Sequence, residues 1–364
     1  MNQNEPALQS FIDQVARARS EGTPLRIRGG GTKDFYGEAA EGEVLDTRPL
    51  LGTPSYEPTE LVVTTRCGTA LSELEALLSA HGQRLAFEPP HFDFGTTVGG
   101  MVCAGLSGPS RASAGAVRDH VLGATVLNGR GEVLSFGGQV IKNVAGYDVS
   151  RLMVGAMGTL GLLLEVSLKV LPVPRATATL RFEFDEAGAI RCLNEWGGLP
   201  LPLDASAWWD GNLIVRLRGA EAAVRSAVLR LGGDRIDEAA AEPFWNGLRN
   251  HTDEYFVTAR QAAEGDAALW RISVPQTAPP LELEGDTMIE WHGAQRWVSG
   301  TVPPARVRAA AAAAGGHATL FRTLHKAPGV FTPLTPPLDR IHRNLKQSFD
   351  PDGIFNPGRL YPTL

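Results

Sequence analysis

Two glycine-rich segments contain the residue types whose spacing most clearly indicates chemistry. The first covers residues 29–33 (Gly-Gly-Gly-Thr-Lys) and the second covers residues 95–100 (Gly-Thr-Thr-Val-Gly-Gly). Because glycine has no Cβ, a ligand can come close to its N–H groups, and we expect the glycines to serve a ligand rather than packing. A concave row of N–H groups binds anions. Two such loops predict a ligand with two phosphates and an extended body, a dinucleotide. The alternative is two tight turns between strands.

Neither segment matches the common phosphate-binding fingerprints. The first fails the G-x-G-x-x-G pattern because Asp34 stands where the last glycine should be. The Gly-Lys-Ser/Thr sequence of a P-loop is also absent from the chain. We therefore expect the phosphates to be held by loops of another architecture.

Composition and charge exclude several classes of protein. The chain has 364 residues, a formal net charge of −6 and 43% hydrophobic residues, which is typical of a soluble globular protein. It has no basic stripe with interleaved aromatic residues, so we expect no nucleic-acid partner. No apolar run approaches the roughly 20 residues of a membrane span, so we expect no transmembrane segment. The first residues lack the features of a signal peptide, which favours a cytoplasmic location.

The three cysteines do not indicate a disulfide framework or a metal centre. Cys67, Cys103 and Cys192 are far apart, and the chain contains no C-x-x-C motif. This pattern is unlike that of a disulfide scaffold or an iron–sulfur protein. We expect each to be a buried, reduced thiol, and we expect no metal site.

Short strands and few helices must position the two loops. Apolar residues at helical spacing predict a helix over residues 7–21, and a second helix is expected between Thr69, as its cap, and Gly82. Residues 1–175 are therefore expected to form an α+β domain. Strands are predicted at residues 24–28, 43–46, 61–65, 85–87 and 162–171, with a hairpin of 121–127 and 132–136.

A different pattern begins near residue 177. Predicted strands and helices follow in the order β-α-β-β-α-β through residue 236, which is the order of a ferredoxin-like unit. These elements are expected at residues 178–184, 186–197, 205–209, 212–218, 220–231 and 235–236. Helices at 239–256 and 305–314, strands at 288–299 and 319–322, and a last helix at 339–348 complete the prediction.

Six motifs, in order along the chain, connect it to a known family. R-G-G-G-T (28–32), E-P-P-H-F-D-F-G-T-T-V-G-G (88–100), R-D-H-V-L-G (118–123), K-N-V-A-G-Y-D-V-S-R-L (142–152) and G-T-L-G (158–161) resemble the PCMH-type FAD domain of the vanillyl-alcohol oxidase superfamily. F-D-P-D-G-I-F-N-P-G-R-L (349–360) resembles the C-terminal signature of FAD-linked 2-hydroxy-acid oxidases. The middle of the chain resembles most the family of FAD-binding E subunits of bacterial glycolate oxidase (glycolate dehydrogenase).

This resemblance implies an α+β fold in three parts and a set of contacts to FAD. The parts are a two-part PCMH-type FAD-binding domain (1–175), a reduced ferredoxin-like α+β cap (176–330) and a C-terminal segment (331–364) that returns to the flavin. The first loop is expected to hold the pyrophosphate and the second to run beside the flavin. The implied cofactor contacts are Gly29, Gly30, Gly31, Thr32, Lys33, Pro89, Gly95, Thr96, Thr97, Gly99, Gly100, Ser107, Gly108, Arg111, Gly115, Asp119, Lys142, Asn143, Gly158, Gly161 and Asn356.

Two residues are candidates for catalysis. Lys142 could stabilise the negative charge of reduced flavin, and His91 could take the hydroxyl proton of a 2-hydroxy acid. Each has a structural alternative, an exposed lysine at a strand end and a loop histidine that hydrogen-bonds the backbone. Lys33 could likewise be a solvated loop lysine, and Asp119 could simply hold the N–H groups of its loop.

The chain departs from the family pattern in one motif. Members that oxidise D-2-hydroxy acids carry H-x-G-D-G-N-x-H, and none of the eight histidines here forms such a pair. We therefore expect an electron-passing subunit of a complex that oxidises glycolate. No histidine follows the first glycines, so we expect the FAD to be bound non-covalently. Its implied partners are an FAD subunit with the metal motif and an iron–sulfur subunit, which could bring it to the inner membrane as a peripheral protein. The alternatives are a self-sufficient FAD oxidoreductase for another alcohol or 2-hydroxy acid, and a structural subunit whose flavin never cycles.

Overall fold

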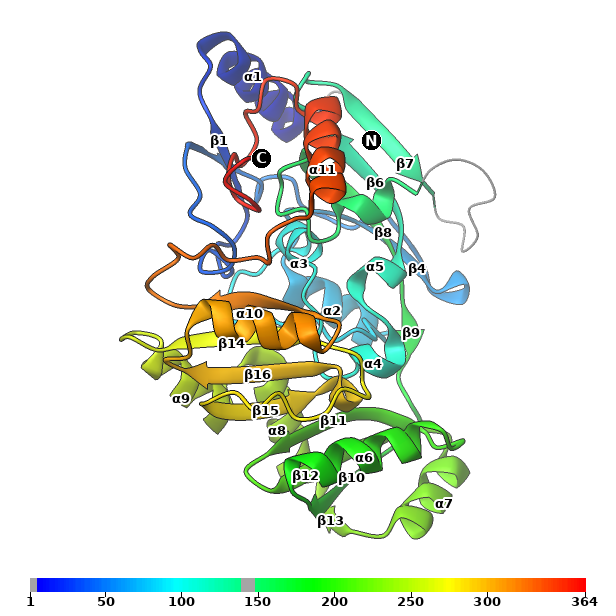
Figure 1. Ribbon diagram of the computed structural model, residues 1–364. Helices are drawn as coiled ribbons and strands as arrows, with labels where there is room; N and C mark the ends of the chain where they lie inside the picture. Colours follow the sequence, from blue (N-terminus) through cyan, green and yellow to red (C-terminus); the bar gives the residue numbers. More distant parts are fainter. Residues whose placement is uncertain (1–4, 139–147) are drawn as a thin grey trace.

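The computed structural model describes residues 5–138 and 148–364 as two lobes built around separate sheets (Figure 1). The predicted contacts Lys142 and Asn143 lie outside the described residues. One lobe contains the first and last described residues and a five-stranded sheet, and the other contains an eight-stranded sheet. The division of the chain at residues 175 and 330 stays a prediction.

The sheet of the first lobe is antiparallel and runs in the order β3-β4-β8-β6-β7. Its strands are β3 (Ser55–Glu57), β4 (Val62–Arg66), β6 (Val121–Leu127), β7 (Val133–Gly137) and β8 (Leu162–Lys169). β8 lies in the middle of the sheet, and its apolar residues Leu162, Leu163, Leu164, Val166 and Leu168 are all buried. Beside this sheet lie α1 (Pro6–Glu21) and a parallel pair, β1 (Leu25–Arg28) with β2 (Glu43–Asp46). The expected hairpin and first helix are thereby confirmed.

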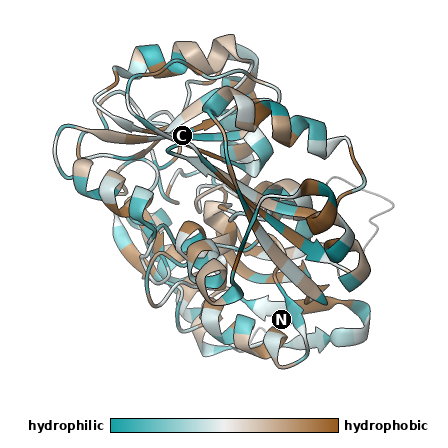
Figure 2. Cartoon of the chain, turned by 90° about the horizontal axis from the view of Figure 1, so that it is seen from below, coloured by the Kyte–Doolittle hydropathy of each residue, from teal (hydrophilic) through white to brown (hydrophobic). Residues whose placement is uncertain are grey.

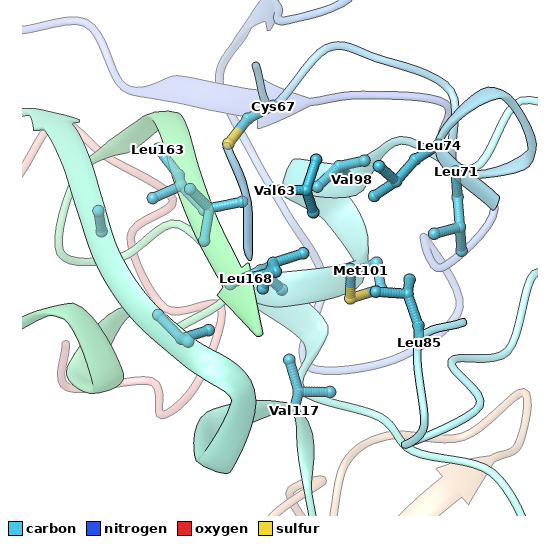
Figure 3. Close-up of a cluster of buried hydrophobic side chains, with 14 of the residues drawn as sticks. Val63, Cys67, Leu71, Leu74, Leu85, Val98, Met101, Val117, Leu163 and Leu168 are labelled. Carbon is cyan, nitrogen blue, oxygen red and sulfur yellow. The ribbon is translucent and has the colours of Figure 1, made fainter. Parts of the chain in front are cut away.

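The first lobe also contains short helices, among them α2 (Leu71–Ser79), α3 (Val98–Ala104), α4 (Arg111–Ala114) and α5 (Val117–His120), and three predictions change in this region. Figure 3 shows the core in which α2 and α3 pack side chains such as Leu74 and Met101. Thr69 is not the cap of α2, because its hydroxyl hydrogen-bonds Gly52 instead. The second glycine segment is only partly a loop, because α3 begins at Val98 and so includes Gly99 and Gly100. The strand expected at residues 85–87 is a buried turn after β5 (Gln83–Arg84), which pairs with β9 (Leu171–Pro172).

The first half of the second lobe follows the predicted ferredoxin-like order. Its strands lie side by side as β13-β10-β12-β11, and α6 and α7 pack on one face of the sheet. The elements are β10 (Ala176–Glu183), α6 (Glu186–Gly197), β11 (Leu203–Trp209), β12 (Asn212–Gly219), α7 (Glu221–Leu231) and β13 (Asp234–Ile236).

The second half extends the sheet beyond the ferredoxin-like unit, which the sequence did not predict. β11 also pairs with β15, so the sheet continues as β15-β16-β14-β17 to eight strands. The expected strand 288–299 is a hairpin interrupted at Trp291–Gly293, and the expected helix 239–256 is two helices. The added elements are α8 (Glu238–Asn250), α9 (Glu254–Ala262), β14 (Ala268–Ser273), β15 (Asp286–Glu290), β16 (Gln295–Gly300), α10 (Pro304–Ala313) and β17 (His317–Arg322).

The C-terminal segment returns to the first lobe after α11 (Pro336–Phe349) (Figure 1). The buried ammonium group of Lys346 donates to the carbonyls of Thr159 and Phe355, 2.9 and 2.6 Å away, and pairs with Asp350. Backbone hydrogen bonds then join residues 354–356 to Leu25 at the start of β1. The segment is therefore part of the packing around the first glycine loop.

The described helices carry mixed hydrophilic and hydrophobic residues (Figure 2). Among the described residues, no helix combines the length and the apolar character needed to cross a membrane.

Candidate cofactor-binding site

A cleft in the first lobe is lined by both glycine segments. β1 delivers residues 29–33 to one wall, and the turn into α3 delivers residues 96–100 to another. The hydroxyl groups of Thr32 and Thr96 lie 2.7 Å apart and join the two loops. The other described lining residues are Ile27, Arg28, Asp34, Thr47, Cys67, Cys103, Ala104, Met157, Gly158, Leu162, Leu163, Asn356 and Arg359.

The first loop presents unused backbone donors to this cleft. Among the described residues, the N–H groups of residues 29–33 have no hydrogen-bond acceptor. Buried or half-buried N–H groups normally have a partner, so five consecutive donors without one indicate a missing acceptor. An anion with several oxygens, such as a diphosphate, fits this row.

The glycines of the first loop also have a packing role, which corrects our expectation. A Cβ on Gly29 would lie 2.2 Å from the Thr97 hydroxyl, and one on Gly30 would lie 1.8 Å from the Gly95 carbonyl oxygen. Both distances are far below any real contact. The glycines are thus needed for the close approach of the two loops that forms the cleft, whatever they do for a ligand.

Lys33 is the cationic side chain of the first loop. Burial lowers the pKa of its ammonium group to about 7. Its only hydrogen bond within the described ranges is a long one, 3.4 Å, to the Thr32 hydroxyl, and it lies 5.4 Å from the centre of the Phe92 ring. A half-buried cation without a carboxylate partner is unfavourable, and a phosphate in the cleft would compensate its charge.

Asn356 and Arg359 hold the cleft in shape. The Asn356 amide accepts from Ile27 N–H at 2.8 Å and donates to the Met157 carbonyl at 2.6 Å. Arg359 donates to carbonyls of the first loop, including that of Asp34. Asn356, which we expected near the flavin, therefore lines the cleft with its amide already engaged. Arg359 was missed, although it belongs to the C-terminal motif.

Eleven of the predicted contacts line the cleft, and the others that the structure describes lie around it. Gly95 touches the first loop, and the Gly161 Cα closely approaches β6. The Asp119 carboxylate accepts from Ala116 N–H at 2.8 Å, which is the structural role we had set beside cofactor binding. Pro89, Ser107, Gly108, Arg111 and Gly115 lie along the segments that lead from the cleft toward the second lobe.

His91, the weaker catalytic candidate, does not line the cleft. Its Nε2 lies 2.9 Å from the carboxylate of Glu75, and its backbone N–H donates to Asn250. Glu75 also pairs with Arg249. This arrangement favours a structural role, although the ring bonds a carboxylate and not the backbone, as the alternative to catalysis had it.

The thiols of Cys67 and Cys103 lie in the wall of the cleft. From the sequence we expected them to be buried, but we did not place them at the cofactor site. Burial raises the pKa of Cys103 to about 12 and that of Cys67 well above its ordinary value. All three cysteines are free, and Cys67 is buried while the other two are half-buried. Within the described part of the chain, no group of three or more histidine, cysteine or acidic side chains is placed to hold a metal ion.

The fold is α+β, and its paired glycine loops present unused N–H donors to one cleft. Residues 8–137 match the family described as FAD binding domain, so the class is that of α+β proteins with an FAD-binding domain. The chain is 45% identical to glycolate oxidase subunit GlcE of Escherichia coli over 356 residues, 98% of each chain. It therefore belongs to the glycolate oxidase subunit GlcE family. The resemblance carried by the six motifs is confirmed.

Two further comparisons place this family among its relatives. D-lactate dehydrogenase of Archaeoglobus fulgidus is 30% identical over 190 residues, which is 51% of this chain and 42% of that protein. A solved structure of alkyldihydroxyacetonephosphate synthase superimposes with a TM-score of 0.66 at 16% identity, over 96% of this chain and 75% of that one. The two proteins thus share a fold.

Proposed function

We propose that this chain binds FAD non-covalently between its glycine loops and takes part in the oxidation of glycolate to glyoxylate as a glycolate oxidase subunit. The observation that carries the proposal is the row of N–H donors at residues 29–33 beside the half-buried Lys33. The name of the Escherichia coli relative supports the substrate and the complex. When bound, FAD would supply a two-electron acceptor.

The residues of the cleft divide this task. Residues 29–33, with Thr96 and Thr97, hold the pyrophosphate, and Asn356 and Arg359 keep the first loop in place. The thiols of Cys67 and Cys103 are protonated at neutral pH because burial raises the pKa of each, so neither is a good nucleophile toward the flavin. This supports non-covalent binding.

Within the complex, we assign the chain an electron-passing role. The sequence lacks the H-x-G-D-G-N-x-H motif of relatives that oxidise D-2-hydroxy acids, so the substrate is oxidised on a partner FAD subunit. An iron–sulfur subunit then receives the electrons. The proposed location is the cytoplasm, with attachment to the inner membrane through these partners.

Anaerobic absorption spectra of the FAD-supplied chain, recorded alone and with its partner subunits, test both FAD binding and the electron-passing role. We expect flavin bands that glycolate leaves unchanged in the isolated chain and bleaches in the complex. A folded chain without bound flavin would refute cofactor binding. Bleaching of the isolated chain would replace the electron-passing role with self-sufficient oxidation. A flavin that stays oxidised while the complex turns over would make the chain a structural subunit.

A further inference from the structure

We propose that Arg111 and Arg271, on the Trp291 indole at the joint between the lobes, bind a small carboxylate anion of the 2-hydroxy-acid or 2-oxo-acid class. The two guanidinium groups come from different lobes, one from α4 (Arg111–Ala114) and one from β14. Together with Tyr36 and Ser107 they line a recess that is distinct from the glycine-loop cleft.

The geometry brings two cations to one aromatic ring. The guanidinium carbon of Arg111 lies 4.6 Å from the centre of the Trp291 ring, and that of Arg271 lies 5.1 Å from it. Burial, together with the charge of Arg271, lowers the pKa of Arg111. Because the charge of Arg271 acts on Arg111, the two positive groups repel each other in a half-buried recess, and an anion bound there would reduce that cost.

Neither arginine has an ion-pair partner among residues 5–138 and 148–364. Arg271 reaches Glu290 only indirectly: its Nε donates to Gln295 at 2.7 Å, and Gln295 donates to Glu290 at 3.1 Å. Burial raises the pKa of Glu290 to about 7, so near neutral pH this acid is only partly charged. Asp119 acts on the charge of Arg111, and Tyr36 hydrogen-bonds Arg271, but within the described ranges no carboxylate forms an ion pair with either guanidinium.

A strained segment holds the indole that both arginines contact. Trp291 and His292 both have positive φ, 54° and 55°, and Gly293 follows at 101°. The Trp291 N–H donates to the Gly108 carbonyl at 3.0 Å, which ties this segment to the first lobe. Two consecutive non-glycine residues in this region of backbone conformation are unfavourable, and such strain gathers at functional sites.

The recess adjoins the cofactor cleft. Ala104 lines both, and the neighbouring Gly105 and Gly155 continue into the recess. An anion held by the arginines would therefore sit beside a flavin that extends from the glycine loops toward the second lobe. This inference rests on the proposed flavin site, but it does not require that the acid is oxidised on this chain.

The test is a calorimetric titration of the full, FAD-loaded chain with oxalate. Oxalate is a dicarboxylate that cannot donate a hydride. The absorbance of the flavin serves as a second readout. We expect saturable binding that is weakened about tenfold or more in Arg271→Gln and in Arg111→Gln, because each removes a charge-assisted hydrogen bond. Arg271→Lys should retain part of the affinity, which keeps the test valid if Arg271→Gln folds poorly. The matched control is Arg235→Gln, on the exposed strand β13.

Three results would overturn the proposal. One is the absence of saturable oxalate binding in the flavin-loaded chain, and another is wild-type affinity in both glutamine variants. The third is loss of FAD affinity in those variants with oxalate binding unchanged, because the arginines would then serve the cofactor. Failure of the flavin proposal is separate, since it appears as absence of FAD binding in the wild-type chain before any oxalate is added.

Discussion

At the scale of single residues, Lys33 is the group whose ionisation should report on the cofactor. Its pKa is lowered to about 7 because burial removes water from the ammonium group. An anion bound beside it would stabilise the charged form and raise that pKa again. Binding of FAD should therefore take up a proton at pH values above 7.

We predict that FAD affinity of the wild-type chain falls as the pH rises from 6 to 9. At its steepest the dissociation constant should rise about tenfold per pH unit, because only the protonated lysine attracts the phosphates. Lys33→Gln should bind more weakly at pH 6 and lose this pH dependence. Fluorescence titrations of FAD at several pH values measure both effects.

Lys169→Gln is the matched control, because Lys169 lies on β8 outside the cleft, and it should keep the wild-type pH profile. An unchanged pH profile in Lys33→Gln would show that another group controls the binding of FAD.

At the scale of elements, the two glycine loops form the cleft by touching each other. A Cβ added at Gly30 would lie 1.8 Å from the Gly95 carbonyl oxygen, which belongs to the backbone and cannot rotate away. The Thr32–Thr96 hydrogen bond depends on the same spacing. The loops must therefore separate if Gly30 acquires a side chain.

Gly30→Ala should abolish tight FAD binding and lower the free energy of unfolding by about 1–3 kcal/mol, the usual cost of overpacking. Denaturant unfolding of the FAD-free chain and FAD titration measure the two effects. Gly197→Ala is the control, because nothing lies within 4 Å of its added Cβ and alanine favours the helix α6 by about 1 kcal/mol. Wild-type FAD affinity in Gly30→Ala would refute the role of loop contact.

At the scale of the whole molecule, a buried ionic network joins the lobes. Arg216 on β12, only 2% exposed, donates to Glu88 at 2.7 Å and to Asp204 at 2.5 Å. Ser110 donates to Asp204 at 3.0 Å, and Arg218 donates to Glu88 at 2.6 Å. Glu88 and Ser110 belong to the first lobe and the other three to the second, so the network couples the two.

We predict that Arg216→Gln lowers the free energy of unfolding by about 3–5 kcal/mol, because it leaves two buried carboxylates without their main partner. It should also split the unfolding of the two lobes into separate transitions in calorimetry. The neighbouring arginines hold the pKa of Glu88 well below its usual range. The contribution of the network is therefore present at neutral pH and lost as the pH falls through the lowered pKa.

The control for this network is Arg181→Gln, which removes an exposed pair with Asp234 and should cost at most about 1 kcal/mol. Equal stability of the Arg216 and Arg181 variants would show that the network does not couple the lobes.

Much of the fold could be predicted because its signals are local. The helix α1 and the hairpin of β6 and β7 follow from spacing and turn residues within a few positions. The strand β14 was missed, and the break at Trp291–Gly293 was not expected, because each depends on neighbours distant in sequence. β14 pairs with β16 and β17, more than twenty residues further along the chain.

By itself, the sequence determined the two glycine loops, the family and the order of the first six elements of the second lobe, since these depend on residue type and short spacing. Only the tertiary structure decided that the loops touch each other, that His91 pairs with Glu75 and that one sheet of eight strands spans the second lobe. It alone placed Arg111 beside Arg271, 160 positions away. The physical reason is that burial, strand pairing and charge proximity are set by contacts between distant segments, and no local pattern records them.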